Sequence, residues 1–328
     1  MNRAAVTSLS PRLLRLGPDD KPVLFAAGFV LLILLVGTGY TLVTQGSAPL
    51  LQPQYLLQQL QVGSFLGIVA AGLMLVILLG HIDLSIPWTL AAGAMMATAV
   101  GGPWAIPVGL GIGLLVGIVN GLGAAYLRVP SMIFTLGMNA VMRDLMVTHT
   151  GSFAPQTAAT DLMQYLAIAR VGGVVPTALL VWLAVSIVVV VVLTRTVLGR
   201  AIYAIGNRER AAYLSGINTN RVILIAFALS GTAAGHAGVL LAGYSTKAYQ
   251  GMGDAYLLPA IAAVVIGGTN ILGGRGRYFG TLVGVILIVL LNSVLSIMQM
   301  PEAGRQIIYG SVIIAMPLVY GRGDRMTG

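Results

Sequence analysis

The chain has 328 residues, of which 57% are hydrophobic and only 8% charged, and its mean hydropathy is +0.93. Soluble domains carry roughly 25% charged residues, so this chain has too few charges to cover a water-facing surface. It contains no cysteine, which excludes disulfides and cysteine-based sites, and its net charge of +9 fits basic loops beside a membrane better than nucleic-acid binding.

Apolar runs near 20 residues, the length that crosses a bilayer, recur along the chain. They lie near 22–43, 62–80, 84–100, 103–127, 130–148, 174–194, 221–243, 256–272, 278–298 and 304–320. The sequence thus predicts an all-α, polytopic membrane bundle of about ten transmembrane helices, with eight as the alternative. The neighbouring runs 62–80 and 84–100 are candidates for broken or re-entrant segments. The first run lacks a clear cleavage site and is read as an uncleaved helix.

Basic residues fix the expected orientation, because cytoplasmic loops carry an excess of Lys and Arg. With the N-terminus inside, 14 of the 18 basic residues fall on inner segments. These are Arg3, Arg12, Arg15, Lys21, Arg128, Arg195, Arg200, Arg208, Arg210, Arg221, Arg275, Arg277, Arg322 and Arg325. The outer ends hold Arg143, Arg170, Lys247 and Arg305. Both termini are therefore expected in the cytoplasm.

The expected organisation is a single membrane domain. Residues 22–321 form this transmembrane domain, 1–21 and 322–328 are cytoplasmic tails, and 195–220 is the longest inner loop. No predicted span is followed by a soluble domain, so any domain that supplies energy is expected on another chain.

The stretch GHIDLS, residues 80–85, separates two apolar runs. Gly80 is expected to end the preceding helix, and Asp83 to cap the free N–H groups of the next one, where its charge suits the helix dipole. Pro87 suits an early helical position that needs no N–H. The alternative is that Asp83, with Gly80, His81 and Ser85, forms an inner gate or lines the substrate path.

Few polar side chains lie within the predicted spans, and such groups usually face a protein interior or a water-filled path. The candidates for a substrate path are Asn120, Asn139, Asn270 and Asn292. Asparagine also clamps helices together, so a structural role stays open for each. No Arg, Lys or Glu falls at a predicted bilayer centre, which argues against a proton relay and suits a neutral polar cargo.

Glycines repeat every four residues in two of the spans. They are Gly109, Gly113, Gly117 and Gly121 in one, and Gly276, Gly280 and Gly284 in the other. Small residues at this spacing let neighbouring helices approach closely, so tight packing is the favoured interpretation, and helices that slide during transport are the alternative.

The inner loop contains RERAAYLS, which predicts a surface helix of about two turns. Asn207 is the expected N-cap, Glu209 lies in the first turn, and Gly216 is the expected stop. So short a helix is not stable alone and needs a partner surface. It either packs on its own membrane domain or docks into a separate cytoplasmic protein, with Glu209, Arg210, Ala211 and Ala212 as the expected contact face.

Three blocks of the sequence resemble the permease subunit of ribose-, xylose- and arabinose-type monosaccharide ABC importers. GHIDLS is similar to the family's GGIDLS, YAIGNRERAAYLSGI to its cytoplasmic block, and AIAAVVIGGTNILGGRGRYFGTLVG to its C-terminal block. The likeness runs from about residue 60 to 320. The chain departs from the pattern at His81, at Asp144, in the Ile-Pro-Trp that follows Ser85, and in Asn207 directly after Gly206.

The resemblance implies a bacterial inner-membrane, multi-pass permease that takes a pentose or hexose from a periplasmic sugar-binding protein. It implies a second permease chain, expected as a homodimer within the lipid bilayer, and separate ATPase subunits that bind ATP and Mg. This chain then binds no cofactor or metal and is not an enzyme. Independently, the sequence has no G-x-x-x-x-G-K-[ST] phosphate loop. The implied contacts to the ATPase are Asn207, Glu209, Arg210, Ala211, Ala212, Ser215 and Gly216.

Two other classes are weighed. GMGD at 251–254 matches the G-x-G-D of intramembrane aspartyl proteases, but no Tyr-Asp dipeptide supplies the second aspartate, and Asp254 before a helix is read as an N-cap. A secondary transporter of a small neutral solute would also be helical, with broken helices, and would need neither an ATPase nor the 207–216 helix as a docking site.

Overall fold

Two long helices cross at the centre of the bundle in the computed structural model, which describes residues 20–151 and 157–321. The basic tail residues Arg3, Arg12, Arg15, Arg322 and Arg325 lie outside this range. The central helices are α2 (Pro53–Leu78) and α10 (Thr219–Ser245), both apolar and largely buried. Because most of each helix is buried within the bundle, neither shows a polar face in sequence.

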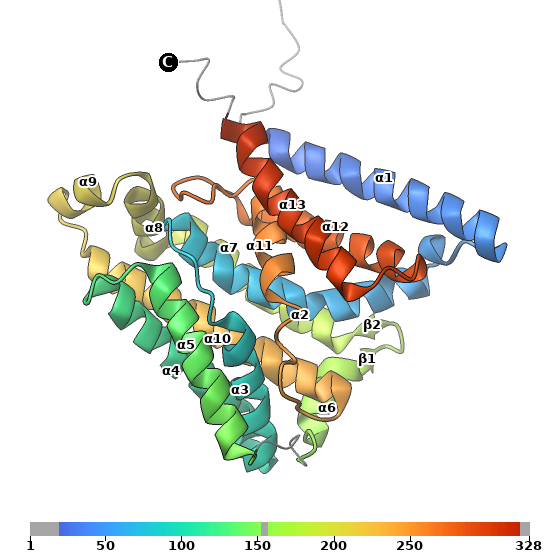
Figure 1. The fold of residues 1–328 in the computed structure, drawn as a ribbon, viewed down its shortest axis with the longest axis horizontal. Helices are drawn as coiled ribbons and strands as arrows, with labels where there is room; N and C mark the ends of the chain where they lie inside the picture. Colours follow the sequence, from blue (N-terminus) through green and yellow to red (C-terminus); the bar gives the residue numbers. More distant parts are fainter. Residues whose placement is uncertain (1–19, 152–156, 322–328) are drawn as a thin grey trace, which may run out of the picture.

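The other helices surround this pair in two groups (Figure 1). On one side lie α3 (Ile86–Val100), α4 (Ala105–Ala125) and α5 (Ser131–His149). On the other lie α1 (Asp20–Gln45), α11 (Leu257–Ile266), α12 (Tyr278–Ile297) and α13 (Glu302–Gly321). The helix α7 (Thr177–Arg195) packs against α2. Short 3₁₀ turns, Pro49–Leu51 and Gly102–Trp104, precede α2 and α4.

The bundle has two ends that differ in structure. One, called here the α9 end, carries α8 (Val197–Asn207) and α9 (Glu209–Leu214). The opposite α6 end carries α6 (Asp161–Ile168) and a hairpin of β1 (Arg170–Val171) and β2 (Val175–Pro176), paired antiparallel. The helix α1 begins towards the α9 end, and α13 ends towards it (Figure 1).

Six helices of the described chain are long and apolar enough to cross a membrane. They coincide with the predicted runs near 22–43, 62–80, 103–127, 174–194, 221–243 and 278–298. The run at 84–100 forms α3, with only 15 residues, and the run at 256–272 forms α11, with 10. At a rise of about 1.5 Å per residue neither reaches across the roughly 30 Å of a bilayer core. The multi-pass helical class is confirmed, and the count of ten stays a prediction.

The glycine repeat of α4 lies directly against α10. A Cβ on Gly113 or Gly117 would clash with the carbonyl oxygen of Gly231 or Phe227, and one on Gly121 would lie 2.8 Å from the Leu224 Cα. The two backbones are therefore in contact along the whole repeat. Tight packing, the favoured interpretation of the repeat, is what the structure shows.

We expect Gly117→Ala to destabilise the protein by about 1–3 kcal/mol, because the added methyl forces α4 away from α10. The matched control is Gly111→Ala on the same helix, where a Cβ would meet nothing within 4 Å. Thermal unfolding of the detergent-solubilised proteins compares the two. Equal unfolding temperatures for both variants would show that the contact is not needed for packing.

Candidate functional site

The chain leaves helical geometry between α2 and α3. Gly80 adopts a φ of +80°, and the His81 N–H donates to the Val76 carbonyl at 3.1 Å, which closes the end of α2. Gly80 therefore ends the helix, as predicted. The next residues run back into the bundle without regular structure, so their backbone polar groups need partners other than a helix ladder.

Side chains of α5 satisfy this irregular backbone. The Leu84 N–H donates to Thr135 Oγ1 at 2.9 Å, and the Ile82 N–H to Ser131 Oγ at 3.4 Å. His81, one departure from the family pattern, lies 3.2 Å from the same Ser131 oxygen through Nδ1. The break is thus bound to the first two turns of α5, and no pattern in the sequence indicated this pairing.

Asp83 lies at the centre of a buried polar cluster and is 1% exposed. Its Oδ1 accepts from the Ser85 N–H at 3.0 Å and from the Ser85 hydroxyl at 2.7 Å, and its Oδ2 accepts from Ser230 Oγ at 3.2 Å. Asn120 Nδ2 donates to Ser85 Oγ at 2.7 Å and to Asp83 Oδ1 at 3.4 Å. The carboxyl therefore joins the break to α4 and α10.

Asp83 does not cap the N-terminus of α3 in the way that the sequence predicted. Asp83 accepts the N–H of Ser85, the residue before α3, and not an N–H of the first helical turn. The Trp88 N–H in that turn is instead accepted by Asn139 Oδ1 of α5 at 3.3 Å. Pro87 stands at the predicted early position. The first turn of α3 is therefore capped from α5, because the side chains of Asp83 and Ser85 are used within the cluster.

At the α9 end, the short helix forms at Glu209–Leu214, within the predicted segment. Asn207 is not its N-cap, contrary to the prediction. Asn207 ends α8, and its Nδ2 donates to the Tyr203 carbonyl at 2.9 Å and to the Gly274 carbonyl at 3.3 Å. The position before α9 is Arg208, which makes no side-chain cap. Gly216, with a φ of +84°, and the hydrogen bond from the Ile217 N–H to the Ala212 carbonyl end the helix as expected.

The exposed face of α9 differs from the predicted one. Ala212 is buried against the rest of the chain, at 5% exposure, so it cannot contact a partner. Tyr213 and Leu214 are instead 68% and 84% exposed. Glu209, Arg210, Ala211 and Ser215 are exposed as expected. Sequence alone did not separate the faces, because a helix of six residues is too short to show a repeat.

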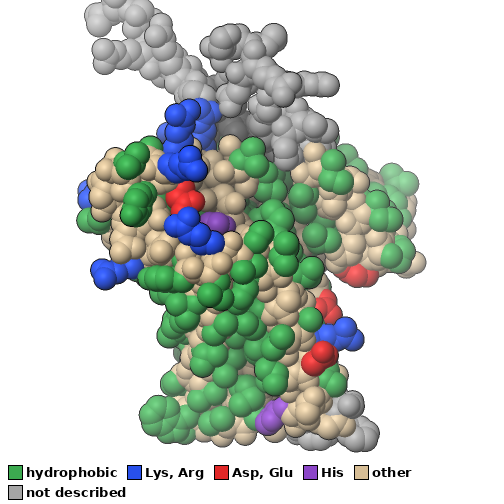
Figure 2. Space-filling model, turned by 60° about the vertical axis from the view of Figure 1, so that its left-hand side comes forward, with side chains coloured by type: hydrophobic (Ala, Val, Ile, Leu, Met, Phe, Trp, Pro, Cys, Tyr) green, Lys and Arg blue, Asp and Glu red, His purple; other side chains and the backbone are tan. Residues whose placement is uncertain are grey.

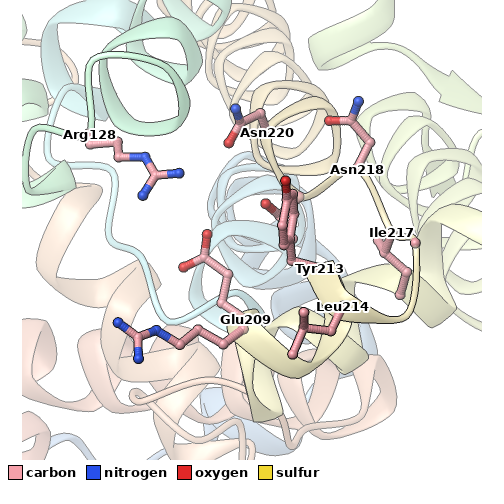
Figure 3. Close-up of a pocket in the computed structure, with 10 residues that line it drawn as sticks. Arg128, Glu209, Tyr213, Leu214, Ile217, Asn218 and Asn220 are labelled. Carbon is pink, nitrogen blue, oxygen red and sulfur yellow. The ribbon is translucent and has the colours of Figure 1, made fainter.

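A cavity of about 860 Å³ opens beside α9 (Figure 3). Its labelled lining residues are Arg128, Glu209, Tyr213, Leu214, Ile217, Asn218 and Asn220. The Glu209 carboxylate and the Arg128 guanidinium point towards one another across it. Arg128 adopts a φ of +52°, a conformation that costs a non-glycine residue about 1–3 kcal/mol and that tends to persist at functional sites.

The four asparagines predicted for a substrate path do not meet in one place. Asn120 is fully buried in the Asp83 cluster, and Asn139 lines a separate cavity on α5. Asn270 is an exposed turn residue whose Oδ1 accepts the Leu272 N–H at 3.1 Å. Asn292 accepts from Arg305 Nη1 at 2.9 Å on the α12 surface. Asn139 lines a cavity, and the four side chains lie in separate parts of the described fold, so a path formed by all four together is not what the fold provides.

We expect Asp83→Asn to lower folded protein in the membrane more than it alters sugar preference, and Asp83→Ala to lower it further. Alanine leaves the Ser230 hydroxyl and the Ser85 N–H without their acceptor, and each such loss costs about 1–3 kcal/mol. The control is Asp161→Asn in the exposed first turn of α6. Membrane yield and unfolding temperature are the measurements. Normal yield of Asp83→Asn together with selective loss of transport would instead assign the residue to the path.

The chain matches a known family along most of its length. Residues 55–317 match the family described as branched-chain amino acid transport system / permease component. Ribose import permease protein RbsC of Escherichia coli (strain K12) is 37% identical over 80% of this chain and 84% of its own. RbsC of Bacillus subtilis (strain 168) is 33% identical over 82% and 85%. The D-allose transport system permease protein AlsC of Escherichia coli (strain K12) is 30% identical over 76% and 77%.

No solved structure is significantly similar to the chain. The match of the family and of these relatives confirms the resemblance carried by the three sequence blocks. The chain belongs to the family of multi-pass membrane permease subunits of ABC importers, in which ATP hydrolysis takes place on a separate subunit.

Proposed function

We propose that this permease moves a monosaccharide, a pentose or hexose, delivered by a separate periplasmic binding protein and driven by ATP hydrolysis on a partner subunit. The observation that carries the proposal is α9, which lies at one end of the bundle (Figure 1) and whose Tyr213 and Leu214 are 68% and 84% exposed. A helix of two turns is not stable alone, and large apolar side chains exposed on it mark a surface that a partner protein covers. The names of the relatives, ribose and D-allose permeases, support the cargo class.

We place the α9 end in the cytoplasm. The basic residues there are Arg128, Arg195, Arg200, Arg208, Arg210, Arg221, Arg275 and Arg277. Figure 2 shows basic side chains gathered towards the top of the described part of the molecule, above a broad hydrophobic face. The positive-inside rule then supports an even number of membrane segments with both termini inside. We propose ten, with α3 and α11 each reaching only part of the way across.

In this topology residues 22–321 form one membrane domain, 195–220 is the coupling loop, and 1–21 and 322–328 are cytoplasmic tails. The proposed contact surface for the ATPase consists of Glu209, Arg210, Tyr213, Leu214 and the rim of the 860 Å³ cavity. ATP and Mg are held by the ATPase, and this chain binds neither. The lipid bilayer surrounds α1 and α7, whose exposed side chains are largely apolar.

A second copy of this chain is proposed to cover α5. The exposed face of α5 carries Arg143 and Asp144 beside apolar residues such as Leu136, whereas that of α7 is lined by leucine, isoleucine and valine. Exposing two adjacent charges to lipid along a membrane helix is costly, so protein and water are the better surroundings for α5. A homodimer that meets across α5 provides both.

We expect Leu214→Asp to abolish co-purification of the ATPase subunit, because a carboxylate would be placed in the apolar contact. The matched control is Leu162→Asp, an exposed leucine on α6 at the opposite end. Tagged permease is purified gently from its native membrane, and the stoichiometry of the ATPase is measured. Retention of the ATPase by Leu214→Asp, or its equal loss from both variants, would contradict docking at α9.

For the dimer, we expect Gly137→Cys to cross-link two permease chains in membranes. Gly137 is exposed on α5, and a Cβ there meets nothing within 4 Å. The chain has no natural cysteine, so the introduced thiol is the only one. Leu183→Cys on the apolar face of α7 is the control. Cross-linking through Leu183 and not Gly137 would place the second copy elsewhere.

A further inference from the structure

Two helices of the bundle begin inside it rather than at an end. The helix α3 follows the break at residues 80–85, and α11 follows the loop 246–256, which starts at the α6 end, where Gln250 Nε2 donates to Thr150 Oγ1 at 2.9 Å. The 246–256 loop meets the first turn of α3: a Cβ on Gly253 would lie 2.7 Å from the Pro87 carbonyl carbon and 2.8 Å from its Cα. In membrane transporters, paired discontinuous helices of this kind mark binding sites near the middle of the bilayer.

A cavity of about 490 Å³ lies at this junction. It is lined by Trp88 of α3, by Leu136, Asn139, Ala140 and Arg143 of α5, and by Asp254 of the 246–256 loop. Its size falls in the range of small-molecule sites, about 300–1,000 Å³. It opens on the same face of α5 on which the second permease chain is proposed.

The chemistry of the lining suits a neutral polyhydroxylated molecule. Asn139 uses Oδ1 to accept the Trp88 N–H, and its Nδ2 makes no hydrogen bond to the described part of the chain. Arg143 supplies only hydrogen-bond donors and the ionised Asp254 carboxylate only acceptors. Together with Asn139 they can therefore bind sugar hydroxyl groups that donate and hydroxyl groups that accept. Trp88 and Leu136 add an apolar wall of the kind that packs on the C–H groups of a sugar ring.

The two charges also balance one another. A site with one cation and one anion carries no net charge, which favours neither anionic nor cationic cargo. It therefore differs from the α9 cavity, where two arginines line the wall beside a single glutamate.

We propose that this cavity is the site in the membrane path where the permease holds a saccharide in transit, with Asn139, Arg143 and Asp254 binding its hydroxyl groups and Trp88 its ring. The proposal rests on the proposed function as a sugar importer. It also gives Asp254 a role other than the N-cap read from sequence, because no side chain caps α11.

The test uses the purified permease–ATPase complex in vesicles, supplied with ATP and the sugar-binding protein, with ribose as the probe. Ala140→Cys places the only thiol of the chain in the cavity wall, and Thr148→Cys places one at the exposed end of the same helix. We expect saturating ribose to slow maleimide labelling of Ala140→Cys several-fold and to leave Thr148→Cys unchanged. Adding Asn139→Ala or Asp254→Asn to Ala140→Cys should remove this protection.

The same two substitutions alone should lower ribose uptake roughly tenfold, the effect of losing a hydrogen bond to a charged or buried polar group. Asp161→Asn is the control, and equal unfolding temperatures show that the variants remain folded. Ribose uptake by the natural chain without protection of Ala140→Cys would overturn the site and leave the proposed function intact. Failure of the natural chain to take up ribose, D-allose or any other monosaccharide tested, with its ATPase, ATP and the sugar-binding protein all present, would overturn the proposed function and this site together.

Discussion

Inside a membrane, a chain that leaves helical geometry has to satisfy its own backbone polar groups, and this requirement organises the permease. The break at 80–85 is satisfied from three directions: hydroxyls of α5 bind its N–H groups, and Asp83 reaches Ser230 of α10 and is reached by Asn120 of α4. The buried Asp83 carboxyl therefore ties the start of α3 to α4 and α10, while α5 holds the backbone of the same break. The glycine contacts between α4 and α10 let those helices come close enough to share it.

The same break connects the two ends of the proposed transport cycle. Near the α9 end, Asn207 of α8 donates to the Gly274 carbonyl, and the Gly274 N–H donates to the Leu78 carbonyl at the end of α2. From there the chain passes through the Asp83 cluster to Pro87, which touches Gly253 beside the saccharide cavity. Packed contacts thus run from α8, which adjoins α9, to the cavity proposed for the saccharide.

Much of this architecture could be predicted from sequence, because membrane spans and basic loops leave strong local signals. The positions of the long helices, the end of α2 at Gly80 and the stop of α9 at Gly216 all follow from composition and glycine chemistry. The failures have a common cause, since they depend on contacts between distant segments. The local sequence predicts Asn207 as a helix cap, but its side chain instead donates to the carbonyl of Gly274, 67 residues away. Ala212 and Leu214 look equally apolar until folding buries one and exposes the other. The cavity is lined by Trp88, Asn139 and Asp254 from three different elements, and no local sequence pattern indicates that these residues lie together.

The central claim is that this chain is the passive membrane path of an importer powered by another subunit. Its most direct test is ribose uptake into vesicles that contain either the permease alone or the permease with its co-purified ATPase, each with and without ATP and the sugar-binding protein. The account predicts uptake only when the ATPase, ATP and the binding protein are all present. Uptake by the permease alone, without ATP, would make it a secondary transporter and contradict the account.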